Sequence, residues 1–191
     1  FAHGGGGFHC VYMSREDLDI FKKKGLWAVT NPGSNTKLAS GIAPVKKMLE
    51  MGIGLAIGTD GPASNNCLDM FREMFLTTGL AKLRENDASA VDADRVLEMA
   101  TAGGARAMGL KDCDTLEAGK RADLVMIDLH RPNMQPENNL SKNLVYSGSK
   151  ENVKLTMVDG KILYENGEFF VGEDVEKIYE KANEIIGKYR E

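Results

Sequence analysis

Gly-Leu-Ala-Ile-Gly-Thr-Asp-Gly, residues 54–61, is the stretch around which the rest of the chain is arranged. Its apolar centre, residues 55–57, predicts a short strand buried on both faces, and the flanking glycines allow a tight turn at Thr59 and Asp60. A carboxylate at the carboxyl end of a buried strand is well placed for chemistry. Aspartate is also favoured as the cap of a following helix, so the octapeptide by itself leaves both roles open for Asp60.

Strand and helix signals alternate before this stretch. Ser14, with Asp17 three residues later, predicts the start of a helix that ends at Gly25. A polar loop is expected over residues 34–41. We expect strands over residues 8–12, 26–30 and 55–57, and helices over residues 15–24 and 45–50. This alternation is typical of parallel βα units.

The pattern changes after Asp60. Helices are expected over residues 66–83, 92–101 and 102–108, with Met70, Met74, Met99 and Met108 packed in the core. A strand over 122–129 follows, and Asp159-Gly160 predicts a hairpin between residues 154–158 and 161–164. Residues 173–189 have one apolar face and predict an amphipathic helix.

Four consecutive glycines, Gly4 to Gly7, stand before the first predicted strand. Glycine-rich runs behave as flexible linkers. We therefore expect residues 1–7 to be a junction that takes no part in the fold, either engineered or in place of an omitted segment.

Composition narrows the classes of partner. The 191 residues carry a net charge of −4, whereas a surface that follows nucleic-acid phosphates normally has an excess of Lys and Arg. The three cysteines, Cys10, Cys67 and Cys113, form no Cys-x-x-Cys pair, which favours reduced thiols. No apolar run approaches the length of a membrane span. We therefore expect a soluble cytoplasmic protein that binds neither nucleic acid nor membrane.

His9 is the histidine most relevant to a site, because its strand belongs to the same parallel set that presents Asp60. In a barrel of βα units the strand ends on one rim share a site. A histidine and a carboxylate there could bind a metal or move protons of a water molecule. The other possibility is a buried histidine whose ring is satisfied by the backbone.

Several long motifs occur in a characteristic order: Phe-His-Cys-Val-Tyr-Met (8–13), Asn-Pro-Gly-Ser-Asn-Thr-Lys-Leu-Ala-Ser-Gly-Ile-Ala-Pro-Val (31–45), Leu-Ala-Ile-Gly-Thr-Asp-Gly-Pro-Ala-Ser-Asn-Asn (55–66), Leu-Glu-Ala-Gly-Lys-Arg-Ala-Asp-Leu (116–124) and Val-Asp-Gly-Lys (158–161). They closely resemble the amidohydrolase superfamily. Within it they resemble the 5-methylthioadenosine/S-adenosylhomocysteine deaminase branch, which has guanine deaminase and triazine hydrolase relatives. The resemblance extends from Phe8 essentially to the end of the chain.

The resemblance implies an α/β fold, the C-terminal part of a (β/α)8 TIM-type barrel from about the sixth strand, followed by the C-terminal strands of a small β-sandwich. Barrel elements would occupy residues 8–113, β-sandwich strands residues 114–170, and a C-terminal helix residues 171–191. A homo-oligomer is expected for the parent protein.

The resemblance also implies roles for two residues. Asp60 matches the aspartate that ligates one divalent metal ion, expected to be zinc, and that accepts a proton from the attacking water. His9 matches the histidine that hydrogen-bonds the metal-bound water or the developing oxyanion. The implied reaction is hydrolytic deamination of a purine-type ring in an adenosine derivative such as 5-methylthioadenosine or S-adenosylhomocysteine, with release of ammonia.

The chain departs from the family pattern in its other ligands. It has three histidines and neither a His-x-His pair nor a His-x-x-Glu motif, and Thr30 stands where relatives commonly carry a histidine. His3 has no His-x-His partner. Two alternatives to the deaminase therefore stay open: a non-catalytic fragment or scaffold of such an enzyme, and a guanine deaminase or triazine hydrolase relative.

Overall fold

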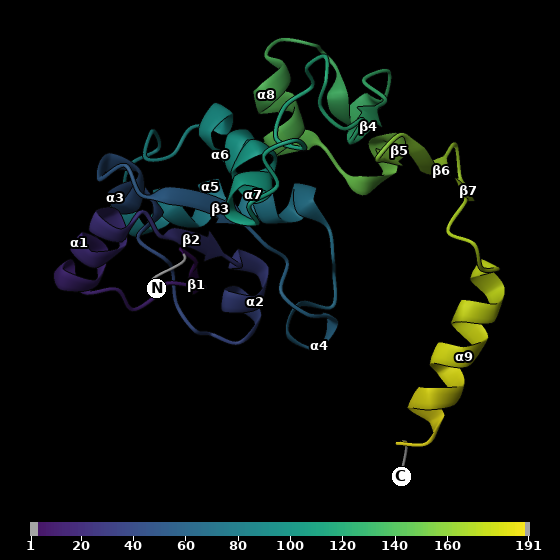
Figure 1. Ribbon diagram of the computed structural model, residues 1–191, viewed down its shortest axis with the longest axis horizontal. Helices are drawn as coiled ribbons and strands as arrows, with labels where there is room; N and C mark the ends of the chain where they lie inside the picture. The colour runs from purple at the N-terminus through teal and green to yellow at the C-terminus, as the bar shows by residue number, and fades with distance from the viewer. Residues whose placement is uncertain (1–3, 190–191) are drawn as a thin grey trace. The chain divides into compact units, whose positions relative to one another are not determined.

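The computed structural model describes residues 4–189, which divide into two compact units. The first contains the chain up to residue 120 together with residues 129–152, and the second contains residues 121–128 and those from 153 onward. In Figure 1 the chain is coloured from purple at the N-terminus to yellow at the C-terminus. The sequence placed 129–152 with the β-sandwich strands, whereas the structure groups this segment with the first unit.

A parallel sheet in the order β1-β2-β3 organises the first unit. Its strands are β1 (Gly6–Phe8), β2 (Trp27–Thr30) and β3 (Gly54–Ile57). Its helices are α1 (Arg15–Lys24), α2 (Pro32–Lys37), α3 (Val45–Glu50), α4 (Pro62–Asn65), α5 (Met70–Glu85), α6 (Ala93–Ala100), α7 (Ala102–Ala107) and α8 (Leu140–Lys142), with η1 (Pro132–Met134), η2 (Asn143–Ser147) and η3 (Lys150–Asn152). Because the strands are parallel, their carboxyl ends meet at one edge of the sheet.

Local signals explain the start and end of α1. Ser14 accepts a hydrogen bond from the backbone of Asp17, whose carboxylate accepts one from the backbone of Ser14 in return. Gly25 then ends the helix in the left-handed conformation, with φ of 60°. The predicted capping box and glycine stop are confirmed, as are β2, α3 and β3 to within a residue at each end.

The core of the first unit is a cluster of buried apolar side chains from the sheet and its helices, among them Leu18, Ala28, Met48, Leu55, Met74, Val96 and Met99. The core positions predicted for Met74 and Met99 are confirmed, and Met70 packs against the cluster. The prediction for Met108 is wrong, because α7 ends at Ala107 and leaves that side chain 71% exposed.

The first strand lies earlier than expected. β1 spans Gly6–Phe8 instead of residues 8–12, because His9 and Cys10 have φ of 65° and 51°, which an extended strand cannot contain. Gly6 and Gly7 are therefore part of the fold, and the expectation that the whole glycine run lies outside it is wrong. A Cβ on Gly6 would overlap the carbonyl oxygen of Trp27, so the close approach of β1 to β2 requires glycine there.

Two further boundaries differ from the sequence prediction. Residues 34–41 were expected to form a polar loop, but the first part of this segment belongs to α2 (Pro32–Lys37). The helix expected from residue 66 begins at Met70, where Asp69 caps it by accepting a hydrogen bond from the Phe71 amide. Asn66 has a φ of 68°, which interrupts helical geometry before that point.

The second unit is an antiparallel sheet in the order β4-β5-β6-β7, followed by a helix. Its elements are β4 (Leu124–Ile127), β5 (Val153–Val158), β6 (Lys161–Glu165), β7 (Glu168–Phe169) and α9 (Val175–Gly187). The predicted hairpin is confirmed: Asp159 and Gly160 have φ of 51° and 76°, the positive values that a tight two-residue turn needs. The amphipathic helix is also confirmed in α9.

Within residues 4–189, none of the helices is both long and apolar enough to span a membrane.

Candidate active site

Polar side chains follow the ends of all the strands in the parallel sheet. His9 comes directly after β1, Asn31 directly after β2, and Asp60 three residues after β3. The strand register pairs Phe8 with Val29 and Thr30 with Ile57, so these residues lie on the same edge. The strand ends thus bring together side chains that are far apart in the chain, such as His9 after β1 and Asp60 after β3.

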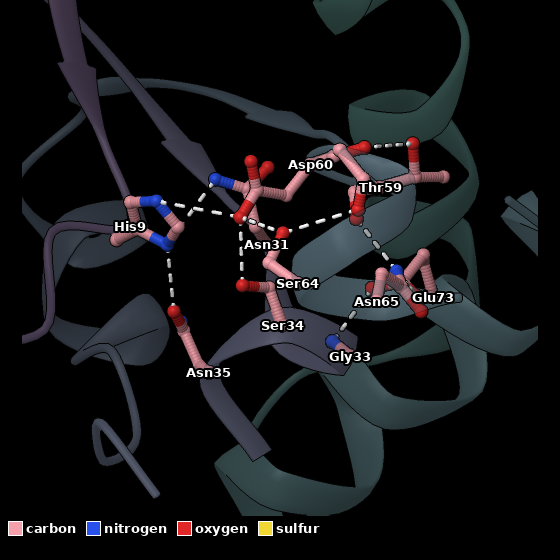
Figure 2. Close-up of polar contacts among 11 residues, drawn as sticks. His9, Asn31, Gly33, Ser34, Asn35, Thr59, Asp60, Ser64, Asn65 and Glu73 are labelled. Carbon is pink, nitrogen blue, oxygen red and sulfur yellow. Dashed lines mark hydrogen bonds and ion pairs between the residues drawn. The ribbon is translucent and has the colours of Figure 1, made fainter. Parts of the chain in front are cut away.

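The Asp60 carboxylate is held by two hydroxyl groups. Ser34 and Ser64 each donate a hydrogen bond of 2.7 Å to Oδ2. These two bonds, first that from Ser64, lower the pKa of Asp60 to about 2, with a smaller contribution from the Gly61 backbone. The group is therefore ionised throughout the neutral pH range. Figure 2 shows both serines directed at this carboxylate.

The helix-cap alternative for Asp60 is wrong. The N-cap residue of the following helix, α4, is Gly61, and no side chain caps that helix. Asp60 itself has a φ of 62°, a left-handed conformation that aspartate tolerates better than most residues. This conformation follows the turn after β3 and leaves the side chain 32% exposed.

His9 lies opposite this carboxylate, with 3.9 Å between its Nε2 and Asp60 Oδ2. On the other side of the ring, Nδ1 lies 2.8 Å from the side-chain oxygen of Asn35, and the Asn31 amide nitrogen is 3.5 Å away (Figure 2). The tautomer of the ring decides which of these two side-chain amides is hydrogen-bonded to Nδ1, and Nε2 lies on the side of Asp60 in either case. The His9 side chain is 42% exposed, so the alternative of a buried histidine satisfied by the backbone is wrong.

Sequence reasoning missed several members of this cluster. Ser34 and Asn35 lie in a segment that was expected to be a loop, although the Asn-Pro-Gly-Ser-Asn motif directly after β2 was a signal for them. Glu73, on α5, was also missed. Its position in the apolar stretch over residues 70–80 was the available signal, because a carboxylate buried beside residues such as Met74 and Ala81 needs specific partners.

Other residues considered from the sequence have no place in the cluster. Thr30, at the end of β2, is 4% exposed and has its backbone oxygen bonded to the Gly58 amide. Cys10 is buried beside His9, and burial raises the pKa of its thiol, which disfavours a nucleophilic role. His3 lies outside the described residues.

Comparison with known proteins shows to which family the chain belongs. Residues 6–163 match the sequence profile of the amidohydrolase family. The chain belongs to the amidohydrolase family.

Similar amidohydrolase relatives include deaminases of adenosine derivatives. The chain is 43% identical over 183 residues to a 5-methylthioadenosine/S-adenosylhomocysteine deaminase of Dictyoglomus thermophilum, covering 94% of this chain and 43% of that protein. It is 44% identical over 174 residues to a 5'-deoxyadenosine deaminase of Methanosarcina acetivorans, covering 91% of this chain and 40% of the relative. The predicted branch of the family is thus confirmed, and the chain spans less than half the length of these relatives.

A solved amidohydrolase structure confirms the fold class. An adenosine deaminase from Xanthomonas campestris with bound zinc superposes with a TM-score of 0.92 at 36% identity, covering 96% of this chain and 42% of that protein. The fold is α/β, with β1 to β3 as part of a TIM-type barrel and β4 to β7 as the separate antiparallel strands.

The donor atoms present in this amidohydrolase chain fit part of a metal site. Carboxylate oxygen and imidazole nitrogen are both ligand types that zinc accepts, and Asp60 and His9 offer one of each. Zinc in enzymes takes at least three protein ligands, however, and no group of three His, Cys, Asp or Glu side chains able to hold a metal occurs within residues 4–189. A zinc site that included these two residues would therefore need further ligands.

Proposed function

We propose that this chain supplies one side of the active site of a metal-dependent hydrolase that removes an amino group from a purine-type ring as ammonia. The observation that carries the proposal is the pairing of ionised Asp60 with solvent-accessible His9 at the same edge of the parallel sheet, where the ends of β3 and β1 bring Asp60 Oδ2 and His9 Nε2 to 3.9 Å from each other. Strand ends on one rim are where barrels of this type carry their chemistry. The names of the relatives support deamination as the reaction.

The proposed metal is one divalent ion, zinc, as in the adenosine deaminase structure that this chain resembles. Asp60 would be one of its ligands, and the remaining ligands would come from a part of the full-length protein outside this chain. Zinc, when bound, would lower the pKa of a water molecule towards neutrality. Such a water molecule could lose a proton near neutral pH and attack a ring carbon. Within residues 4–189 the ionised Asp60 carboxylate has no group of three metal-ligating side chains around it, and ligands from elsewhere in the full-length protein would account for this.

Asp60 is proposed to take up the proton that the attacking water loses and to pass it to the departing ammonia. Its low pKa ensures the ionised form but makes it a weak base, so the transfer depends on an acidic water facing it. The serine hydroxyls both occupy Oδ2, which orients the carboxylate for this task.

His9 is proposed to hydrogen-bond the attacking water or the developing oxyanion. Asn35 fixes the ring through Nδ1, so Nε2 is the nitrogen left to act on the side of Asp60. Substrate atoms would lie beside these two residues. An adenosine derivative such as 5-methylthioadenosine is proposed as substrate, because deaminases of such compounds are among the similar relatives.

The decisive experiment is Asp60→Asn in the full-length protein, with ammonia release from 5-methylthioadenosine and bound zinc as the measurements. Loss of a ligand and proton acceptor is expected to lower kcat by about 10²–10⁴-fold, together with zinc content. Asp94→Asn, an exposed change on α6, is the matched control and should alter neither. An Asp60→Asn protein with full activity and full zinc content would overturn the proposal.

A further inference from the structure

Glu73 on α5 is a fully buried carboxylate that has no part in the proposed reaction. Its side chain is 0% exposed, and its two oxygens have separate partners. Oε2 accepts a hydrogen bond of 2.7 Å from the backbone amide of Gly33, and Oε1 accepts one of 2.9 Å from the side-chain amide of Asn65. Burying a carboxylate is costly unless it is well bonded, so this one has a specific task.

The bond to Gly33 holds the start of α2. Gly33 immediately precedes Ser34, one of the two hydroxyls that bond Asp60. A Cβ at position 33 would collide with Glu73 Oε1, so glycine is needed for the carboxylate to approach the backbone. Glu73 thus positions one of the segments that surround Asp60.

The bond to Asn65 holds the other segment. The Asn65 amide nitrogen also donates a hydrogen bond of 2.6 Å to the carbonyl oxygen of Thr59, the residue before Asp60 (Figure 2). Asn65 is 1% exposed, and within the described residues its Oδ1 is buried with no hydrogen-bond partner. Leaving a buried acceptor without a partner is unfavourable, which indicates that the amide is oriented for Glu73 and Thr59 at the expense of its own oxygen.

We propose that Glu73 is a positioning residue whose carboxylate ties the α2 start to the Thr59–Asn65 turn and so places the Asp60 carboxylate for reaction. It contacts neither substrate nor the reacting atoms. The inference rests on the proposed function, because it concerns the same site. It adds Glu73 to the residues that shape this site, although Glu73 lies 40 positions from its partner Gly33 in the chain.

The test uses Glu73→Gln in the full-length protein. Glutamine keeps the shape but has only one acceptor oxygen, so one of the two donors loses its partner. We expect kcat to fall about 10- to 100-fold with little change in KM, as for other residues that support a catalytic group from behind. Amide hydrogen exchange at residues 33–34 and 59–61 should also become faster, and this readout requires no activity.

A second variant, Asn65→Ala, guards against a Glu73→Gln protein that does not fold. It removes the link to Thr59 but keeps the bond between Glu73 and Gly33. Exchange is then expected to rise at residues 59–61 and to stay unchanged at 33–34, again with a lower kcat. Normal kcat and normal exchange in Asn65→Ala would overturn the proposal.

Thr77→Val is the matched control. Thr77 lies one turn further along α5, is 3% exposed, and donates a hydrogen bond of 2.8 Å to the Glu73 carbonyl within the helix. Its loss should lower Tm without changing kcat or exchange at residues 59–61. The proposal fails if Thr77→Val reproduces both effects, or if Glu73→Gln shows neither. A wild-type protein that releases no ammonia would refute the proposed function, while hydrogen exchange would still decide the role of Glu73.

Discussion

The two serine hydroxyls at Asp60 determine the charge of that side chain. Because its pKa in the folded protein is lowered from the ordinary aspartate value of 3.8 to about 2, Asp60 favours folding at pH values above that ordinary value. That contribution disappears as the pH falls through the folded value. Since neither value is near neutrality, the carboxylate stays ionised under any ordinary assay condition.

Removing one hydroxyl should raise this pKa. In Ser64→Ala the larger of the two hydrogen-bond contributions is lost, so we expect the pKa of Asp60 to move from about 2 towards its ordinary value of 3.8. A carbon-13 NMR titration of the Asp60 carboxyl in the metal-free protein measures it. Ser89→Ala, which removes a hydroxyl bonded to Asp87, should leave the Asp60 titration unchanged. An unchanged Asp60 pKa in Ser64→Ala would contradict the assignment.

At the scale of elements, strand β1 depends on a glycine that the sequence presents as part of a linker. Gly6 pairs with Trp27 across the parallel ladder, and their backbones approach too closely for any Cβ. His9 is the first residue after this strand, and its amide bonds to the Val29 carbonyl. The position of His9 therefore follows from the pairing of β1 with β2.

Gly6→Ala is expected to destabilise the protein by about 1–3 kcal/mol, because the methyl group must displace the Trp27 backbone. Gly79→Ala on α5 is the opposite case. Nothing lies within 4 Å of its added Cβ, and alanine favours a helix interior, so a gain of about 0.5–1 kcal/mol is expected. Thermal unfolding of the two variants measures both changes in stability. If Gly6→Ala were as stable as the wild type, β1 could shift away from β2 without a loss of stability, which would contradict this expectation.

At the scale of the whole molecule, the described chain leaves the parallel sheet open. In residues 4–189 both β1 and β3 have one unpaired edge, and Phe8 on β1 is 71% exposed. Parallel sheets are normally covered on both faces and edges. Together with coverage of about 40% of the relatives' length, the open sheet supports the proposal that the remaining metal ligands belong to another part of the full-length protein. A homo-oligomeric state and a cytoplasmic location stay predictions.

The isolated 191-residue chain is therefore expected to bind zinc below one ion per chain and to release no ammonia from 5-methylthioadenosine, because one carboxylate and one imidazole are too few ligands. The full-length protein should do both. Zinc content and ammonia release, measured side by side, compare them, with full-length Asp60→Asn as the inactive reference. If the isolated chain bound one zinc ion per chain and released ammonia, this expectation would be contradicted. The proposal that the remaining ligands come from elsewhere in the full-length protein would then fail as well.

The sequence by itself determined the local elements and the family. The capping box at Ser14, the apolar strand before Asp60 and the Asp159-Gly160 turn are each encoded by a few neighbouring residues, so they could be predicted correctly. The ordered motifs then selected His9 and Asp60 as candidates.

Only the tertiary structure decided which side chains surround that aspartate. Ser34 lies 26 residues from Asp60, and Gly33 lies 40 residues from Glu73, so no local pattern relates them. Their contacts depend on the β1-β2-β3 register and on the hydrogen bonds that Glu73 on α5 makes to Gly33 and Asn65. The same register required glycine at position 6, because strand spacing is a property of two paired segments and leaves no trace in either one separately.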